Sequence, residues 1–480
     1  MGAEDVVTNV FWRSGDFFAK GSSTSRSHRA RASGDASERV FEARFGAARA
    51  FGFATGFFVG FAFAFFEGLA RFAAMPGGFR PRYLKLPATR VAARYFHGRA
   101  ARSTDVRPLA GLLVVDLTRL LPGPFATQLL ADLGARVVKI EEPDLGDYAR
   151  WMPPEVEGHG HAFTAINRGK ESVALDLKDP EAQEALRRLV AMADVLVESF
   201  RPGVLARLGL APDALLAANP RLVVASMSGY GATGPLAEAP GHDLNYQALA
   251  GIVALNGDAR PLPPAAQTAD MAGALYAVVA ILAALRERDR SGRGRVLDLA
   301  LYDAAVAVNV LALERARAGD AQRLGESELA GALPAYGVYE ASDGGHVALA
   351  ALEGKFWERF ARAVGREDWI ERHLDRSDAF RADVAAVFRT RPRDVWVDLL
   401  VGAGVPATPV LAPGEALAHP HARARGVGSP GAPLGLAPRG RAPTLGEHTE
   451  KVLREAGLEG VALDRLLARA SVRASLREPI

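Results

Sequence analysis

The feature that most constrains the fold is a regular alternation that begins at about residue 108. Short, almost continuously apolar runs alternate with segments of helical periodicity such as 125–133 and 180–192. Strands buried on both faces read as continuous apolar runs, and helices between them provide the crossovers that parallel strands need. We therefore predict an α/β fold in which helices cover both faces of a parallel sheet. The predicted strands are 111–117, 136–141, 172–177, 194–198, 221–226 and 295–299.

The pattern changes near residue 335, where we expect a second domain. Two short strands, 336–339 and 346–351, flank the turn sequence Asp-Gly-Gly and predict an antiparallel hairpin. Helices at 354–364 and 392–402 and a strand at 405–411 follow, which together indicate a smaller α+β domain. The other helices predicted in the body are 271–288, 301–318 and one within 444–458.

The first 107 residues have a different composition. They contain 16 of the 23 phenylalanines and 17 basic against eight acidic residues, whereas the remainder carries 41 basic and 47 acidic residues. An Arg- and Ser-rich stretch typical of disorder precedes residues 50–66, which are apolar or small and close to the shortest length that spans a membrane. Three interpretations are open: a membrane or interfacial anchor, an accessory helical segment, or a reading frame extended beyond a true start near Met75 or Val106. We favour the last, because the composition changes abruptly, and we expect no membrane association and a cytoplasmic location.

Several kinds of chemistry lack their sequence signatures. The chain has no cysteine, which excludes disulfides, thiolate zinc sites and thiol nucleophiles. The slightly acidic body predicts no nucleic-acid surface. The turn after the first predicted strand lacks the Gly-x-Gly-x-x-Gly fingerprint of dinucleotide binding, and no Walker A sequence occurs. His159 and His161 form a His-x-His pair without a nearby pair of carboxylates, so we expect no metal site.

Several segments, taken in order, carry a resemblance to a known family. The body opens with LLVVDLTRLLPGPFATQLLADLGARVVKIEEPDLGDYAR. The segments that follow are INRGKESVALDLKDPE, ADVLVESFRPGVLARLGL, GYGATGPLAEAPGHDLNYQALAG, TADMAGAL, HPHARARG and PTLGEHTEKVLREAGL. This ordered set resembles the family III CoA-transferases, also called the CaiB/BaiF family, and within it the α-methylacyl-CoA racemase branch. The resemblance covers about residues 108–458.

The resemblance implies a fold and an assembly. Family members have a Rossmann-like large domain, a smaller inserted α+β domain, and two chains interlocked as a homodimer. On this sequence the large CoA-binding domain with its linker maps to 108–335 and the small domain to 336–425. Residues 426–480 then form the return linker and the C-terminal part of the large domain. The implied substrate is an acyl-CoA, so coenzyme A belongs to the substrate and no separate cofactor is expected.

Three residues are candidates for the chemistry, and each also has an ordinary structural explanation. Asp270 directly precedes an apolar helix, where aspartate is a common N-cap. His242 could be a loop histidine bonded to Asp243, and Glu353 suits the first turn of a helix. The resemblance implies further roles. The aspartate matching Asp270 is a nucleophile in family transferases and an acid/base in family racemases. In the racemase branch the histidine matching His242 is a base, and the glutamate matching Glu353 orients it.

Coenzyme A needs cations for its phosphates and a slot for its adenine. The resemblance implies contacts with the thioester arm, with the pantetheine and adenine, and with the phosphates. The candidates, in that order, are Leu120 and Leu121, then Ser199 and Phe200, then Arg207, Arg168, Lys170 and Lys139. For each cation a solvated surface charge is the ordinary alternative. Glu142 is a departure from the family, because several relatives have a phosphate-binding arginine at that position.

The joint presence of His242, Asp270 and Glu353 favours a racemase that interconverts (2R)- and (2S)-2-methylacyl-CoA by proton transfer through an enolate. Two groups that titrate near neutrality, on opposite faces of the enolate, can remove and return the α-proton. Burial can raise the pKa of a carboxyl enough for this task. The alternative is a CoA-transferase that moves CoA between an acyl-CoA and a free carboxylic acid through an anhydride on Asp270. A CoA-binding dimer without turnover is a third interpretation.

Overall fold

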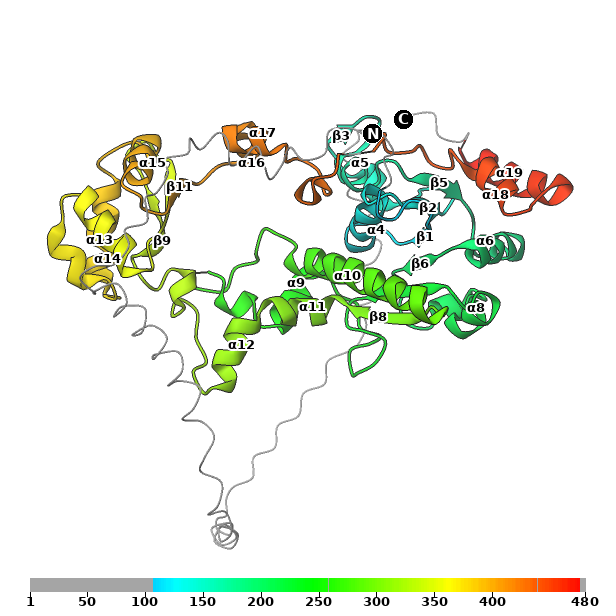
Figure 1. Cartoon of the computed structure of the whole chain (residues 1–480), viewed down its shortest axis with the longest axis horizontal. Coiled ribbons are helices and arrows are strands. Elements are labelled where there is room, and N and C mark those ends of the chain that lie inside the picture. The colour runs from blue at the N-terminus through cyan, green and yellow to red at the C-terminus, as the bar shows by residue number, and fades with distance from the viewer. Residues whose placement is uncertain (1–106, 258, 438, 475–480) are drawn as a thin grey trace, which may run out of the picture. The chain divides into compact units, whose positions relative to one another are not determined.

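The computed structural model describes residues 107–257, 259–437 and 439–474 (Figure 1). The predictions made for residues 50–66 and for the start of translation lie outside this part of the chain. Within it, two groups of secondary-structure elements have separate hydrophobic cores: one surrounds a six-stranded sheet and the other a three-stranded sheet.

The larger sheet is parallel throughout and has the strand order β5-β2-β1-β6-β7-β8. Its central strand β1 (Leu113–Leu117) pairs with β2 on one side and with β6 on the other, so that Val115 lies opposite both Val138 and Leu196. These valine- and leucine-rich runs are buried, as parallel strands covered on both faces require. The predicted parallel α/β fold is confirmed. The other strands are β2 (Arg136–Glu141), β5 (Glu171–Ala174), β6 (Val195–Glu198), β7 (Val223–Ser228) and β8 (Val296–Ala300).

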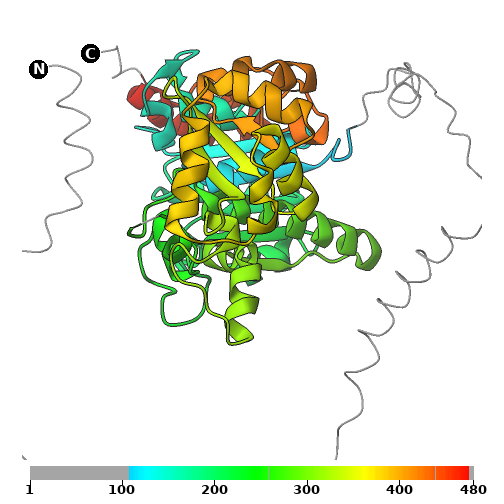
Figure 2. The same cartoon turned by 90° about the vertical axis from the view of Figure 1, so that its left-hand side faces the viewer.

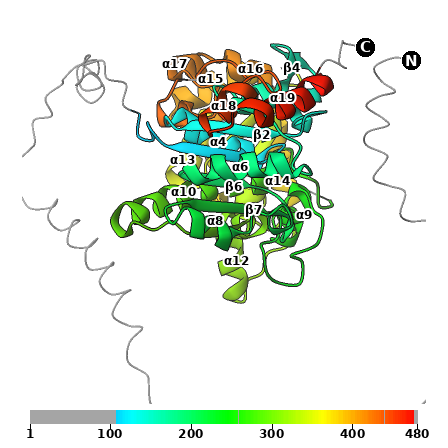
Figure 3. The same cartoon turned by 90° about the vertical axis from the view of Figure 1, so that its right-hand side faces the viewer.

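Successive side chains of the central strands enter two different cores, which lie on opposite faces of the sheet. Val114 packs with residues of α4 (Pro122–Asp132), α10 (Thr268–Ser291) and α11 (Leu301–Val308). Val115 packs in the core that holds residues of α6 (Pro180–Met192), α18 (Thr449–Glu455) and α19 (Gly460–Ala474). Figures 1 and 3 show these two helical layers. The C-terminal helices therefore complete one face of a sheet built from residues 113–300.

The smaller sheet is antiparallel, in the order β11-β10-β9, and its helices surround an aromatic core (yellow to orange in Figure 2). The strands are β9 (Tyr336–Glu340), β10 (His346–Ala350) and β11 (Ala407–Pro409). The helices are α13 (Gly354–Ala363), α14 (Asp378–Phe388) and α15 (Arg393–Gly402). Three fully buried tryptophans, Trp357, Trp369 and Trp396, fill the space between them. The predicted hairpin is confirmed, whereas α14 has no counterpart among the predicted helices.

Among the predicted elements whose bounds differ from the structure, two helices bear on later arguments. The long helix expected at 301–318 is two helices, α11 and α12 (Val310–Arg317), separated by Asn309. The side chain of Asn309 donates a hydrogen bond to the Ala250 carbonyl (2.9 Å), a tertiary contact that periodicity does not report. The helix expected to start at Met271 begins at Thr268, so Asp270 lies inside its first turn and is not its N-cap.

The remaining elements are short and connect the parts already described. They are β3 (Glu155–Val156), β4 (His159–Gly160), α5 (His161–Ile166), α7 (Val204–Arg207), α8 (Pro212–Ala218), α9 (Asp243–Leu249), α16 (Pro413–Ala418) and α17 (Pro420–Arg425). Of these, α9 bears on the site because it begins directly after His242.

Among the described helices, α10 alone has the length and apolar composition to cross a membrane. Half of its apolar stretch is buried inside the protein, where Ala274, Ala277 and Ile281 belong to the core on one face of the sheet. This packing is that of a core helix, and the described residues give no support for a membrane span.

Candidate active site

The strand order places a topological switch point between β1 and β6. The chain runs from β1 to β2 on one side, and the next strand added on the other side of β1 is β6. Ligands of open parallel sheets bind at such a point, beyond the carboxyl ends of the strands. Leu120 and Leu121 follow β1 there, and Ser199 and Phe200 follow β6. The fold therefore brings these four predicted CoA contacts to the carboxyl ends of two neighbouring central strands.

The loop after β1 has an unusual backbone conformation that buried charges hold in place. Leu120 has φ of +66°, a left-handed value that is uncommon for a residue with a β-carbon. Its N–H donates to Asp147 Oδ1 (3.0 Å). The ammonium group of Lys139 donates to the Thr118 carbonyl (2.7 Å) and pairs with Asp147 Oδ2 (3.0 Å). Charged side chains inside the protein thus fix the position of Leu120.

The structure does not support phosphate binding by Lys139 or Lys170. Both side chains are fully buried, and the Lys170 ammonium contacts Asp116, the Pro124 carbonyl and two further oxygens. Burial opposes ionisation of Asp116, but the ammonium groups of Lys139 and Lys170 and hydrogen bonds from two threonine hydroxyls together outweigh it and lower the pKa of Asp116 to about 2. Burial lowers the pKa of Lys170 to about 8. Because both cations are engaged inside the protein, neither has a free face for a CoA phosphate.

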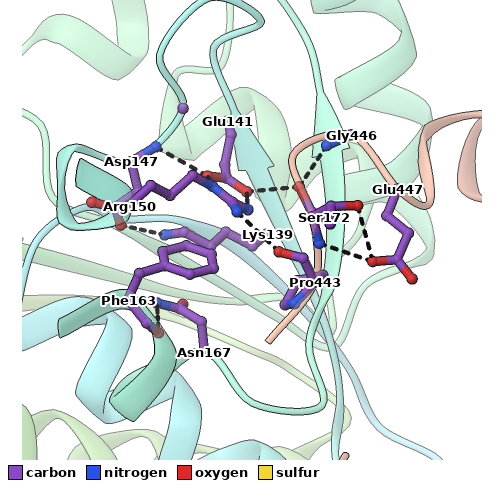
Figure 4. A network of polar contacts seen from close by, with 12 residues as sticks. Lys139, Glu141, Asp147, Arg150, Phe163, Asn167, Ser172, Pro443, Gly446 and Glu447 are labelled. Carbon is purple, nitrogen blue, oxygen red and sulfur yellow. Dashed lines mark hydrogen bonds and ion pairs between the residues drawn. The ribbon is translucent and has the colours of Figure 1, made fainter. Parts of the chain in front are cut away.

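A second buried ion pair, between Arg150 and Glu141, holds the C-terminal return segment beside the large sheet (Figure 4). Arg150 forms an ion pair with Glu141 (2.7 Å), lies over the ring of Phe163 (3.7 Å to the centroid) and donates to the Pro443 carbonyl (2.9 Å). Ser172 donates to Glu141 and accepts from the Gly446 N–H (2.7 and 2.9 Å). These contacts hold residues 443–446 beside strands β2 and β5, so the C-terminal segment packs on the same region as the large sheet.

The other cationic candidates are accessible. Arg207 is exposed at the end of α7, and Arg168 is partly exposed, with Glu157 3.6 Å from its guanidinium. Both remain predictions as phosphate contacts. Glu142 has a local structural role, because its carboxylate accepts from the N–H groups of Asp144, Leu145 and Gly146 in the following turn.

One residue, Asp243, links the segments that carry the catalytic candidates His242 and Asp270. His242 is the exposed residue before α9, and Asp270 is in the first turn of α10. Asp243 follows His242, and its Oδ1 accepts from the N–H groups of Ala269 (2.9 Å) and Asp270 (3.1 Å). The carboxylate of Asp243 thus joins the N-terminal ends of the two helices that carry the candidates.

The surroundings of the Asp270 carboxyl raise its pKa. Burial, and then the neighbouring charge of Asp243, raise the pKa of Asp270 to about 7. Burial, and then the charge of Asp270, raise the pKa of Tyr246 to about 12, so its hydroxyl stays neutral beside the carboxyl. Tyr246 fits closely between glycines: a β-carbon at Gly229 would lie 2.4 Å from its hydroxyl oxygen, and one at Gly241 2.7 Å from its ring.

Glu353 belongs to a different group of elements from His242 and Asp270. It precedes α13 in the smaller α+β region and is exposed. No hydrogen bond or ion pair among the described residues joins it to His242. The structure thus brings His242 and Asp270 together and leaves Glu353 in a different part of the chain.

The sequence profile of CoA-transferase family III matches residues 109–449. The chain belongs to CoA-transferase family III. It is an enzyme of this class, which includes both racemases and CoA-transferases.

The relatives of this family III chain include both activities at similar identity. It is 32% identical to the α-methylacyl-CoA racemase of Homo sapiens over 77% of this chain and the whole of that protein. It is 34% identical to the acetyl-CoA:oxalate CoA-transferase of Acetobacter aceti over 72% of this chain and 95% of that enzyme. A CaiB/BaiF family protein from Brucella suis has a solved structure that matches with a TM-score of 0.64 and 32% identity, over 73% of this chain and 99% of the other.

Sequence reasoning missed the residues that connect the site of this family III enzyme. Asp243 was considered only as a hydrogen-bond partner of His242, yet it caps α10. Tyr246 and Gln247 were not singled out, although both are buried beside it. The available signal was Asp243 itself, an acidic residue in the first turn of a short helix. Its second partner lies 27 positions along the chain, a distance that a local pattern does not cover.

Proposed function

We propose that this family III enzyme is a racemase of 2-methylacyl-CoA thioesters. The observation that carries the proposal is the junction at Asp243, which ties the N-terminal end of the helix after His242 to the first turn of the helix that holds Asp270. Inversion at the α-carbon needs one proton acceptor and one proton donor at the same carbon. The junction supplies a histidine and a weakly acidic carboxyl for those roles.

The proton transfer balances with these two groups alone. A neutral His242 takes the α-proton and becomes imidazolium, while the C–H electron pair forms the enolate of the thioester. Protonated Asp270 then gives its proton to the opposite face of the α-carbon and becomes a carboxylate. The reverse direction uses ionised Asp270 as the base and imidazolium as the acid.

The acidity of Asp270 favours proton transfer over nucleophilic attack. A carboxyl with a pKa of about 7 is present in both protonation states near neutral pH, which suits a group that alternates between acid and base. A carboxylate nucleophile that attacks a thioester must instead be ionised. Below pH 7 the protonated form of Asp270 predominates, so a transferase would have to use the less populated carboxylate form.

We further propose a homodimer in which a second copy supplies Glu353 to His242. The support is an apolar surface on α10, formed by Leu275 (51% exposed), Tyr276 (49%) and Val279 (63%). These side chains lie on the helix whose opposite side is core, so they sit at a rigid part of the molecule. Clustered apolar side chains on a rigid helix are typical of a surface that another chain covers.

The double substitution Leu275→Glu with Val279→Glu is expected to convert the dimer into monomer, because two charges would have to be buried at the interface. Sedimentation equilibrium of wild type and variant measures the mass directly. Val461→Glu is the matched control, since Val461 is 66% exposed but lies on α19. An unchanged mass in the double variant would contradict the role of α10 in assembly.

The function is tested by hydrogen exchange at the α-carbon. Purified enzyme is incubated in D₂O with one enantiomer of a 2-methylacyl-CoA and no acceptor acid, and the thioester is followed by mass spectrometry and chiral chromatography. Uptake of one deuterium with loss of optical purity is the expected result. Absence of uptake, together with CoA transfer once a carboxylic acid is added, would contradict the racemase and favour the transferase.

A further inference from the structure

The first turn of α10 is capped by another helix. Gln267, the residue before the helix, makes no capping hydrogen bond with its side chain. The carboxylate of Asp243 takes this place, with Oδ1 accepting from Ala269 and Asp270. A negative charge at a helix N-terminus is favourable, because the N–H groups there have no partner within the helix.

The second oxygen of Asp243 is also held. It accepts from Nε2 of Gln247, whose side chain is fully buried one turn further along α9 and also reaches the Ala266 carbonyl (3.3 Å). Oε1 of Gln247 is buried without a hydrogen-bond partner among the described residues. The amide therefore faces Asp243 with its donor side, and this arrangement fits an ionised carboxylate.

Asp243 also directly follows His242 in the chain. The His242 N–H donates to Asn245 Oδ1 (3.0 Å), which fixes the backbone at the start of α9. Because Asp243 is bonded to α10 and covalently linked to His242, displacement of its carboxylate would alter the positions of both catalytic candidates. The charge of Asp243 also lies close enough to Asp270 to oppose its ionisation.

We propose that Asp243 is a positioning residue of the active site: its carboxylate holds the first turn of α10 to the start of α9, sets the distance between His242 and Asp270, and places a negative charge beside the carboxyl that donates the proton. The inference rests on the proposed racemase function for the use of that proton. The control of Asp270 by Asp243 is a property of the protein and is measurable without substrate.

Titratable groups approach the start of α10 from several elements. On α9 these are Asp243 and Tyr246, with His242 just before it; Tyr230, in the loop after β7, packs against both Tyr246 and Tyr302 of α11. The acidic residue of α4 is Asp132, whose carboxylate accepts from Gln128 in its own helix. Among these groups of the described chain, Asp243 is the charge that acts on Asp270.

The decisive variant is Asp243→Asn, which keeps the shape and the Oδ1 acceptor and removes the charge. Gln247 can turn its amide over so that its unpartnered oxygen accepts from the new NH₂ group. We expect the midpoint of Asp270 ionisation to fall by about one pH unit, because a like charge is removed while burial remains. Carbon-13 NMR of the full chain labelled at aspartate carboxyl carbons measures this midpoint, and Asp270→Asn assigns the signal.

Two further variants keep the test decisive. Asp303→Asn is the matched control, because burial and a neighbouring aspartate also raise the pKa of Asp303 in the first turn of α11; it should leave the Asp270 midpoint unchanged. Asp243→Ser, a neutral residue that also favours helix starts, replaces the asparagine variant should that one not fold. An Asp270 midpoint that stays at its wild-type value in the neutral variant overturns the inference.

The pH dependence of α-deuterium uptake then connects the inference to function. In Asp243→Asn the part of the rate profile that depends on protonated Asp270 should move to lower pH by the shift that NMR measures. A wild-type enzyme without uptake would contradict the racemase and leave the NMR result to decide the role of Asp243. A wild-type enzyme with uptake and an Asp243→Asn profile that does not move would contradict the inference alone.

Discussion

Asp270→Asn and His242→Ala are each expected to lower the rate of racemisation by about 10²–10⁴-fold, the usual contribution of a positioned general acid or base. Inversion removes a proton from one face and returns one to the other, so neither group can replace the other. Asparagine preserves the shape of Asp270 and has no ionisable proton, while alanine at His242 removes the imidazole. Chiral analysis of the thioester after timed incubation measures the rate.

The two variants should differ in the exchange that remains. With Asp270 absent, His242 can still remove and return the proton on its own face, so slow deuterium uptake without inversion is expected for one enantiomer. His242→Ala should show the same behaviour for the other enantiomer. His419→Ala and Asp303→Asn are matched controls, because they alter another histidine before a helix and another aspartate in a first turn. Wild-type racemisation in either test variant would contradict the two-residue mechanism.

The sequence was a good guide to the fold wherever burial follows a local period. The predicted bounds of β2 and α6 agree with the structure residue for residue, because one is a continuously buried strand and the other begins at Pro180 after the capping Asp179. The break at Asn309 was not predictable, since its side chain finds its partner 59 residues away. Local pattern identifies elements, and tertiary contacts decide where some of them stop.

The charged residues of the site were harder to interpret than the apolar ones. Lys139 was one candidate for a phosphate contact, yet it lies in a strand that was itself predicted to be buried on both faces. A buried lysine is almost always paired, so its position in RVVKIE was a sign of an internal ion pair. The partner Asp147 lies beyond the strand, and only the folded chain shows that it also binds Leu120.

Lys139→Met is expected to lower the free energy of unfolding by about 3–5 kcal/mol, because methionine fills a similar space but leaves Asp147 without its cation and Asp116 with one cation fewer. Urea unfolding followed by circular dichroism measures the change. Lys178→Met is the matched control, since Lys178 is exposed and its replacement should change stability by no more than about 0.5 kcal/mol.

The same substitution should also change how stability depends on acid. The pKa of Asp116 is lowered from 3.8 to about 2 in the folded protein, so its contribution to stability is present above pH 4 and is lost as the pH falls towards 2. Without Lys139 the folded pKa rises towards the unfolded value, and this loss between pH 4 and 2 becomes smaller. The variant should therefore be less stable at pH 7 and lose less stability on acidification than the wild type. Parallel unfolding curves over that range would contradict the pairing, and with it the support that Lys139 and Asp147 give to the loop at Leu120.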